Sequence, residues 1–449
     1  MRQASTSGSG AGQPPRVLLA ASTWWPVSAR MAMAMAHCGF EVFALVPPGH
    51  PAHYVKCIKK VYRLTALHPQ TSMRQAIKDC GPDLIVPCDD RVVLQLHQIH
   101  DLYPEFRPLI EYSLGDPKSY SVVDSRQGLM DLAAKLGIRC PRTAAVASEK
   151  QAREMFARFA PAAVMKVDGT FGGDGVRVIR SAEEAAEAFR ALRSATGLMP
   201  AIKLWLVYRD PLALWTFRRR DQFKITMQEF IEGFPANNML CSWQGAILDE
   251  VSAVPVACKG LTGAATIVRL TDNPEMSQVA GRIARRLGVS GFFGLDFIIE
   301  HRSGDAYLIE MNPRCTQLGH LQSSDRGDLA SVLCEQVSGQ HRSMQGQPIL
   351  GNTIAFFPQA WRGSEPGDGW FSSHQDIPWE EARLVEELLL DPWPERQWAG
   401  RAYRWMGRLV HGLASKRSAT VRTLARADAR REDIVEARAP VRPPGAPGV

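Results

Sequence analysis

The sequence lacks the signatures of several common protein classes. Its nine cysteines include no C-x-x-C pair and no His/Cys cluster with the spacing of a zinc site. No uninterrupted apolar run reaches about 18 residues, the length that a membrane-spanning helix needs, so we expect no transmembrane segment. An odd number of scattered cysteines is typical of a reducing compartment. These absences predict a globular cytoplasmic protein without a zinc site or a disulfide framework.

The body of the chain also lacks a net charge. The formal charge of the 449 residues is +7, but residues 401–449 contain eleven Lys and Arg against four Asp and Glu. The other residues carry 42 charges of each sign. Residues 1–400 have no excess of basic side chains that would bind the phosphates of a nucleic acid. We therefore expect no specific nucleic-acid partner. An amphipathic pattern over residues 401–413 predicts a basic helix that docks on its own protein or binds an anionic membrane surface.

A third absence concerns the first strand. Its apolar run leads into STWWP at residues 22–26, with no G-x-G-x-x-G to bring a pyrophosphate to the backbone. Short buried-strand patterns nevertheless alternate with helical patterns through residue 90, which is typical of a parallel sheet with crossover helices. The expected strands are Val17–Ala21, Glu41–Val46 and Leu84–Pro87, and the expected helices are Ser28–His37 and Thr71–Asp79.

Beyond residue 116 the patterns indicate a mixture of helices and strands. Apolar periodicity predicts helices over Ser125–Leu136, Glu183–Leu192, Pro274–Leu287 and Leu329–Gln336. Strands are predicted over Thr226–Ile231, 238–252 and Asn352–Pro358, and two more within Val164–Ile179 flank a loop with four glycines. Residues 203–221, rich in Trp and Arg, form an insertion that these patterns do not assign.

The most informative stretch is residues 294–314, GLDFIIEHRSGDAYLIEMNPR. Two apolar, β-rich runs flank a polar turn, which predicts a β-hairpin. If Ser303 lies at the centre of the turn, Asp296 pairs directly with Glu310, and Asn312 points to the same face as Glu310. The opposite face would then carry a wholly apolar set, namely Leu295, Phe297, Ile299, Tyr307, Ile309 and Met311.

The polar face of this hairpin predicts a cation site. Two like charges opposite each other destabilise a sheet unless a cation joins them. Carboxylate and amide oxygens suit Mg²⁺, so we predict that Asp296, Glu310 and Asn312 bind a magnesium ion of the type that holds nucleotide phosphates. Arg314, two residues after Asn312, is a candidate anion clamp. Solvated hairpin carboxylates and a surface arginine are the alternative interpretation.

A glycine-rich loop is the second candidate phosphate site. The loop Gly169–Gly175 offers unhindered backbone N–H groups, and Lys166 precedes it on the predicted strand. No G-K-[ST] closes the loop, so it is not a Walker A motif. A hairpin turn without function and a solvated lysine are the alternatives to a phosphate-binding role.

Together these motifs resemble the ATP-grasp superfamily, in particular the branch of biotin carboxylase and the carbamoyl-phosphate synthase large subunit. The resemblance runs from about residue 16 to 340 and is most specific at Leu308–Arg314, LIEMNPR. It implies an α/β, Rossmann-like pre-ATP-grasp domain followed by an α+β ATP-grasp fold. The implied divisions are a disordered N-terminus over 1–15, the pre-ATP-grasp domain over 16–115, the ATP-grasp domain over 116–345 with a lid at about 164–228, a C-terminal extension over 346–400, and a basic helix with a disordered tail over 401–449.

The resemblance also implies roles for individual residues. The metal ligands would be Asp296, Glu310 and Asn312. The cations that act on the phosphates or on the acceptor carboxylate would be Lys166, Arg269 and Arg314. The nucleotide would contact Arg126, Lys166, Gly172, Gly173, Gly175, Glu229, Ile231 and Glu232, with adenine at the backbone of Glu229 and Ile231 and the ribose at Glu232.

The activity that the resemblance implies is a carboxylate–amine ligase that uses ATP and Mg²⁺, with Mn²⁺ as an alternative metal. A carboxylate attacks ATP to give an acyl phosphate and ADP, and an amine or another nucleophile then displaces phosphate. The alternatives are a phosphotransferase that stops after the first step and a non-catalytic nucleotide-binding regulator. The expected substrates are small molecules or peptides, and a homodimer is one open oligomeric state.

One stretch departs from the resemblance. Residues 315–320 read CTQLGH, whereas biotin carboxylase-like enzymes continue with a Gln/Glu/His set around bicarbonate. This difference argues against bicarbonate as the substrate. His320 is either a base or substrate contact, or a hydrogen-bonded loop histidine.

Overall fold

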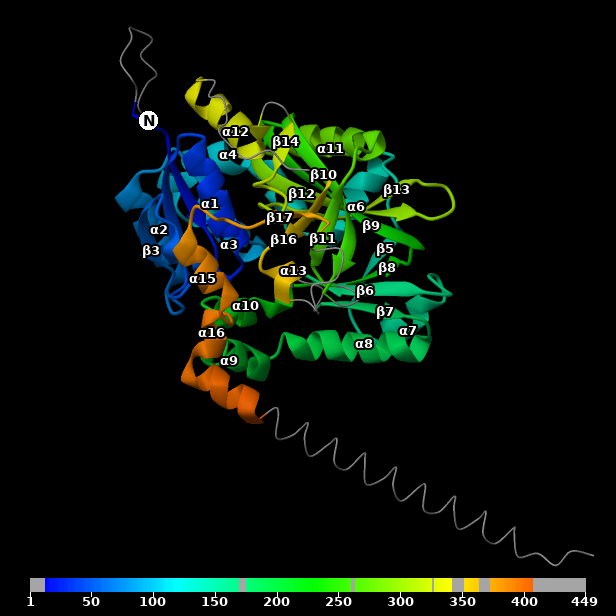
Figure 1. Ribbon diagram of the computed structural model, residues 1–449. Helices are drawn as coiled ribbons and strands as arrows, with labels where there is room; N and C mark the ends of the chain where they lie inside the picture. Colours follow the sequence, from blue (N-terminus) through cyan, green and yellow to red (C-terminus); the bar gives the residue numbers. More distant parts are fainter. Residues whose placement is uncertain are drawn as a thin grey trace, which may run out of the picture. The chain divides into compact units, whose positions relative to one another are not determined.

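The computed structural model describes residues 13–168, 175–259, 263–324, 327–340, 351–362 and 372–406 (Figure 1). The chain divides into two compact units, Met1–Trp393 and Pro394–Val449. The described residues of the first unit form four β-sheets with helices packed on them, which confirms the predicted mixed α/β class. None of the described helices is both long and apolar enough to cross a membrane.

The first sheet is wholly parallel, in the order β3-β2-β1-β4. Alternate residues of β1 enter different cores, because Val17 and Leu19 pack against α1 while Leu18 and Ala20 pack against α2 and α3. Helices thus cover both faces, as in other parallel sheets. The elements are β1 (Arg16–Ala20), α1 (Val27–His37), β2 (Glu41–Val46), η1 (Pro51–Tyr54), β3 (Ile58–Arg63), α2 (Pro69–Cys80), β4 (Leu84–Pro87) and α3 (Asp90–Leu102).

A helical segment connects this sheet to the second one. It comprises η2 (Pro104–Phe106), α4 (Arg107–Leu114), η3 (Pro117–Ser119), α5 (Tyr120–Val123) and α6 (Arg126–Lys135). The second sheet is antiparallel, in the order β5-β8-β6-β7. Its strands and covering helices are β5 (Thr143–Val146), α7 (Glu149–Phe156), β6 (Ala163–Val167), β7 (Val176–Ile179), α8 (Ala182–Ala195) and β8 (Ile225–Glu229).

The insertion between α8 and β8 is helical. It contains α9 (Leu198–Leu206), α10 (Ala213–Arg218) and the short turn η4 (Arg220–Gln222). A buried ion pair fixes it to the first sheet's helices, since Arg91 Nη1 of α3 lies 2.7 Å from Asp210 Oδ2. The stretch that the sequence left unassigned is therefore a packed part of the first unit.

The third sheet has seven strands in the order β13-β12-β9-β10-β11-β16-β17. Its last two strands come from the stretch that was expected to be a separate extension. Its elements are β9 (Gly233–Trp243), β10 (Ala246–Cys258), β11 (Ala265–Leu270), α11 (Pro274–Leu287), β12 (Gly291–Glu300), β13 (Ala306–Asn312), β16 (Thr353–Phe356) and β17 (His374–Asp376). The remaining elements are β14 (Gln322–Ser324), β15 (Gly327–Asp328), α12 (Leu329–Ser338), α13 (Gln359–Arg362), α15 (Ala382–Leu389) and α16 (Trp393–Arg396).

The β12–β13 hairpin has the predicted register at one end only. Asp296 pairs with Glu310 as predicted, but a β-bulge follows, so that Phe297 pairs with Leu308. A bulge inserts one extra residue and reverses the alternation of side chains beyond it. The prediction that Tyr307 and Ile309 face the core is therefore wrong. The buried apolar face instead carries Leu295, Phe297, Ile299, Ala306, Leu308 and Met311.

Candidate active site

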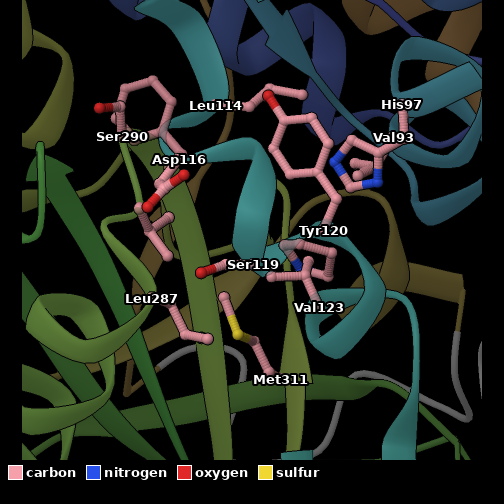
Figure 2. Close-up of a pocket in the computed structure, with 13 residues that line it drawn as sticks. Val93, His97, Leu114, Asp116, Ser119, Tyr120, Val123, Leu287, Ser290 and Met311 are labelled. Carbon is pink, nitrogen blue, oxygen red and sulfur yellow. The ribbon is translucent and has the colours of Figure 1, made fainter. Parts of the chain in front are cut away.

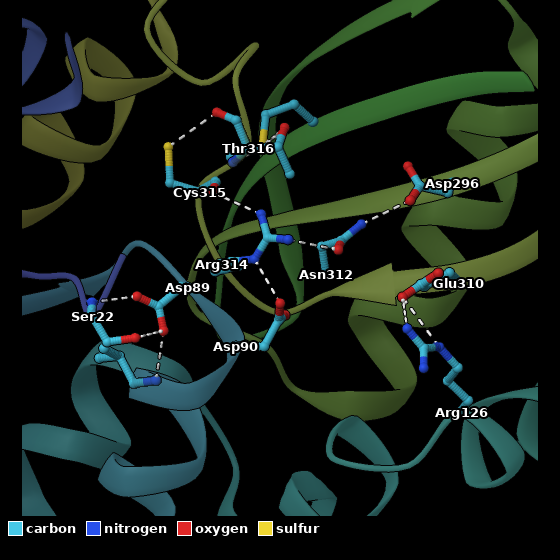
Figure 3. Close-up of polar contacts among 12 residues, drawn as sticks. Ser22, Asp89, Asp90, Arg126, Asp296, Glu310, Asn312, Arg314, Cys315 and Thr316 are labelled. Atoms are coloured by element: carbon cyan, nitrogen blue, oxygen red, sulfur yellow. Dashed lines mark hydrogen bonds and ion pairs between the residues drawn. The ribbon is translucent and has the colours of Figure 1, made fainter. Parts of the chain in front are cut away.

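The predicted metal ligands lie together where β13 ends beside β12 (Figure 3). Asp296 and Glu310 stand opposite each other on the two strands. Asp296 accepts hydrogen bonds from the amides of Asn237 and of Asn312, the latter at 2.9 Å between Nδ2 and Oδ2. Burial first and the charge of Glu310 second raise the pKa of Asp296. The site therefore contains a half-buried carboxylate that a neighbouring cation would stabilise in its ionised form.

Glu310, in contrast, already has cationic neighbours. Arg126 donates to Glu310 Oε1 from Nη2 at 2.6 Å and from Nε at 3.2 Å. Burial alone would raise the pKa of Glu310, but the charges of Arg126 and Lys166 lower it below its usual value. Lys166 is only 6% exposed, and burial lowers its pKa despite the nearby carboxylates. Lys166 is therefore a buried lysine of β6 near the carboxylate pair and is not a solvated surface lysine.

Helix α6 positions Arg126 from its first turn. The Ser125 hydroxyl accepts the N–H of Gly128 at 3.0 Å and so caps the helix. The Arg126 guanidinium then spans the space between the sheets, since Nη1 donates to the carbonyl of Val167 at 2.6 Å. Asp168 Oδ1 lies 3.5 Å from the same nitrogen. The register that the sequence suggested for Arg126 thus places it beside the predicted metal site.

Arg314 connects the site to the first sheet. Its Nε donates to Asp90 Oδ2 at 3.0 Å, and its guanidinium lies 5.6 Å from the ring of Trp25. Asp90 begins α3, and the preceding Asp89 caps that helix while also accepting the N–H of Ser22. The carboxyl ends of β1 and β4 therefore meet the end of β13 around one buried arginine (Figure 3).

The Asn312 amide is oriented away from the arrangement expected of a metal ligand. Its Nδ2 faces Asp296, whereas its Oδ1 accepts Arg314 Nη2 at 3.1 Å. A metal bound by all three side chains requires this amide to turn over, because only the oxygen can ligate. In the described part of the chain, no group of three or more His, Cys, Asp or Glu side chains is placed to bind a metal. The candidate site thus depends on two carboxylates and one amide.

The other predicted nucleotide contacts are more scattered. Gly172 and Gly173 lie outside the described residues, and the carbonyl of Gly175 accepts the N–H of Val167 at 3.1 Å.

Arg269 is exposed on β11, and no hydrogen bond or ion pair among the described residues joins it to the carboxylate pair. The structure therefore does not place Arg269 with the predicted site.

The segment between β8 and β9 links two sheets, where the adenine contacts were predicted. The N–H of Glu229 already donates to the carbonyl of Arg142, and its side chain pairs with the Arg142 guanidinium at 3.1 Å. Ile231 is half-buried, while Glu232 is exposed and its carbonyl accepts the N–H of His301. The backbone groups left for a ligand at this hinge are thus fewer than predicted.

Three contributors to the site escaped the sequence prediction. They are Asn237, Asp168 and Asp90, which contact Asp296, Arg126 and Arg314. Asp90 follows strand β4 of a parallel sheet, the edge at which ligands bind in such folds, so its position was a usable signal, whereas no local pattern indicated Asn237 or Asp168. Trp25 follows β1 at the same edge, where the sequence allowed either a cleft-lining or a sheet-covering role, and it lies against Arg314.

A small cavity, which the candidate metal ligands do not line, lies beside Met311 (Figure 2). Its volume is about 20 Å³, enough for one water molecule. From β13 and its end it is lined by Met311 and Pro313, not by Glu310 or Asn312, and His97 and Tyr120 close it from the other side. This cavity is too small for a nucleotide.

Comparison with known proteins shows which families this chain resembles. Residues 214–317, which include the hairpin and both carboxylates, match the ATP-grasp domain family. This segment is similar to an ATP-grasp domain. The carbamoyl phosphate synthase large chain of Rubrobacter xylanophilus is 26% identical to this chain over 249 residues, which is 54% of the chain and 22% of the relative. That of Deinococcus deserti is 22% identical over 201 residues, 45% of the chain and 18% of the relative. The chain thus spans about a fifth of the length of these relatives.

Solved structures share the fold. The biotin carboxylase domain of the Hydrogenobacter thermophilus 2-oxoglutarate carboxylase, in complex with MgADP, ADP and bicarbonate, has a TM-score of 0.54 at 14% identity over 75% of this chain and 72% of that one. The carboxyaminoimidazole ribonucleotide synthase of Aspergillus clavatus, complexed with ATP, has a TM-score of 0.53 at 11% identity over 74% of this chain and 79% of that one. At these identities the likeness is one of fold.

Proposed function

We propose that this chain is an ATP-grasp enzyme, namely an ATP- and magnesium-dependent ligase that joins a carboxylate to an amine through an acyl phosphate. The observation that carries the proposal is the pair of half-buried carboxylates, Asp296 and Glu310, with the cations Arg126, Lys166 and Arg314 near them. Solved structures of similar fold are complexes with MgADP or ATP, which supports the use of a nucleotide.

Two carboxylates and an amide suit a magnesium ion. Asp296 and Glu310 would hold the ion, and Asn312 would join them after its amide turns over. The ion would supply positive charge that stabilises the oxygens of the transferring phosphoryl group. The raised pKa of Asp296 fits this role, because an added cation stabilises the ionised form of a carboxylate that lies beside another carboxylate.

Other side chains of the site would bind the ATP phosphates and the acceptor carboxylate. Lys166 and Arg126 lie beside Glu310 and would bind phosphate oxygens. Arg314 is held rigidly by Asp90 and would bind the acceptor carboxylate. A preorganised donor of this kind is worth about 3–4 kcal/mol to the transition state, because it needs no reorientation when charge develops.

A screen of ADP release tests the proposal and its alternatives. Pools of amino acids and carboxylic acids are offered with MgATP, with and without added amines. A ligase releases ADP only when acid and amine are both present, or shows positional isotope exchange in ATP with the acid alone. A phosphorylated product that accumulates without an amine would indicate a phosphotransferase instead, and nucleotide binding without any turnover would indicate a regulator.

A further inference from the structure

A buried cluster outside the carboxylate pair joins three separate segments of the first unit. His320 lies in the loop after Arg314, Arg30 in the first turn of α1, and Asp376 on β17. The Nε2 atom of His320 lies 2.8 Å from Asp376 Oδ2, and Arg30 donates to the other carboxylate oxygen. The side chains of His320 and Asp376 are each only 6% exposed.

The partners of this cluster fix the roles of the two imidazole nitrogens. Burial alone would raise the pKa of Asp376, but the charge of Arg30 and the hydrogen bond from His320 lower it to about 2. Asp376 is thus a carboxylate that accepts, so the proton of a neutral His320 resides on Nε2. The Nδ1 atom is then a hydrogen-bond acceptor. It is buried and has no hydrogen-bond partner among the described residues, although buried polar atoms nearly always have one.

The cluster borders the predicted acceptor side of the active site. Arg314 packs on Trp25, just before α1, while Asp376 binds Arg30 within the first turn of the same helix. The first residue of the loop from Arg314 to His320 thus lies against Trp25, and its last residue is linked to Arg30 through Asp376. Asp328, at the N-terminus of α12, is a further acidic group whose charge interacts with His320.

We propose that His320 Nδ1 accepts a proton from the attacking amine in the second half-reaction; this inference rests on the proposed ligase function. The amine nitrogen forms a bond to the carbonyl carbon of the acyl phosphate, and its proton passes to Nδ1. The bond between that carbon and the phosphate oxygen breaks, and phosphate leaves with the electron pair. The proton then passes to the departing phosphate, which restores the neutral imidazole. Asp376 stabilises the transient imidazolium and holds the ring in place, in the manner of the carboxylate in other His–Asp pairs.

In this proposal β17 contributes to the reaction by carrying Asp376, which orients His320. Because β17 carries Asp376, the end of the seven-stranded sheet would orient a group that acts on the second substrate. It also defines the chemistry of that substrate, which must present an N–H to a neutral acceptor beside Arg30. The first half-reaction involves only the carboxylate and the phosphates, so it does not need His320.

The test separates the two half-reactions with hydroxylamine, which attacks acyl phosphates without help from a protein base. The full chain is compared with three variants, His320→Gln, Asp376→Asn and the control His374→Gln. His374 lies on the same strand, and no hydrogen bond among the described residues joins it to His320. Each protein receives MgATP and the acid that passes the ADP screen, with either hydroxylamine or the productive amine. In His320→Gln the new amide can still donate to Asp376 but cannot act as a base.

We expect His320→Gln to lower amide formation about 100-fold or more, the usual contribution of a general base, while hydroxamate formation stays within twofold of the wild type. Asp376→Asn should lower amide formation in the same selective way, and His374→Gln should change neither rate. Parallel loss of both products in His320→Gln would overturn the inference and assign the cluster a structural role; unchanged amide formation would overturn it too. A wild-type chain that forms no hydroxamate with any acid would instead refute the proposed function on which the inference rests.

Discussion

The two carboxylates of the site differ in how their charges are balanced. Glu310 is paired with Arg126 and lies near Lys166, which together hold its pKa below the usual value. Asp296 has only amide donors from Asn237 and Asn312, and burial raises its pKa. The cationic side chains of the protein thus favour the ionised form of Glu310, whereas a bound metal cation would favour the ionised form of Asp296.

The first prediction concerns the carboxylate that is already paired. Glu310→Gln keeps the shape of the side chain but removes the charge that Arg126 and Lys166 face. We expect acid-dependent ADP formation to fall about 100- to 1,000-fold, comparable with the loss of another preorganised charged or polar group, while the circular dichroism spectrum is unchanged. The control is Glu300→Gln, whose side chain accepts the Ser303 hydroxyl at the turn of the same hairpin. Equal activity of the two variants would contradict the site.

Asp376 makes the stability of the fold depend on pH. Its folded pKa, about 2, lies below the ordinary value of about 4, so the folded state binds fewer protons between these values. The stabilisation is then present above about pH 4 and is lost as the pH falls toward 2; a shift of this size corresponds to about 2 kcal/mol. We expect urea unfolding to show Asp376→Asn less stable than the wild type by about this amount at pH 7, with the gap narrowing as the pH falls from about 4 to about 2. A gap that is independent of pH would contradict the assignment.

Among the secondary-structure elements, α6 determines where Arg126 lies. An arginine in the first turn of a helix is unfavourable beside the positive end of the helix dipole, and its pairing with Glu310 offsets this cost. The Ser125 cap holds that turn in place. The Ser125 hydroxyl therefore helps to place the guanidinium beside Glu310, although it contacts only the backbone N–H of Gly128.

This contact gives a prediction with a matched control. Ser125→Ala should lower the free energy of unfolding by about 1 kcal/mol and weaken MgADP binding up to about fivefold, as measured by denaturation and calorimetry. Ser148→Ala removes the corresponding cap of α7, where Ser148 Oγ accepts the N–H of Gln151 at 3.1 Å. The control should lose similar stability without a change in affinity. The same loss of affinity in both variants would show that α6 has no special role.

The sequence predicted the elements that obey local rules and missed those that depend on distant contacts. The pairing of Asp296 with Glu310 follows from alternation around a turn, whereas the bulge beside it has no local signal. Strand β3, with the sequence IKKVYR, was missed because an edge strand exposes charged residues that hide its pattern. The ion pair between Arg314 and Asp90 joins positions 224 residues apart, so only the folded chain reveals it.

Two ion pairs at the N-terminus of α3 connect the sheets of the first unit. Asp90 of α3 pairs with Arg314, which follows β13 of the third sheet. Arg91, the residue after Asp90, pairs with Asp210 of the helical insertion. The N-terminus of α3 thus connects the second sheet, through its insertion, with the predicted acceptor site. Asp210 also accepts the N–H of Leu212 at 2.8 Å, which shapes the loop between α9 and α10.

The last prediction tests the ion pair between Arg91 and Asp210. Asp210→Asn removes the charge from a pair whose members are 4% and 7% exposed, and breaking a buried pair from one side typically costs about 3–5 kcal/mol. We expect a loss of this size in urea unfolding, together with faster proteolysis within residues 198–222. Asp221→Asn is the control, because its pair with Arg193 at 3.1 Å is largely exposed, at 69% and 50%, and such pairs contribute about 0–1 kcal/mol. Equal losses of stability in the two variants would show that the pair of Arg91 with Asp210 does not hold the insertion in place. The contact of Asp90 with Arg314 would then be independent of the insertion.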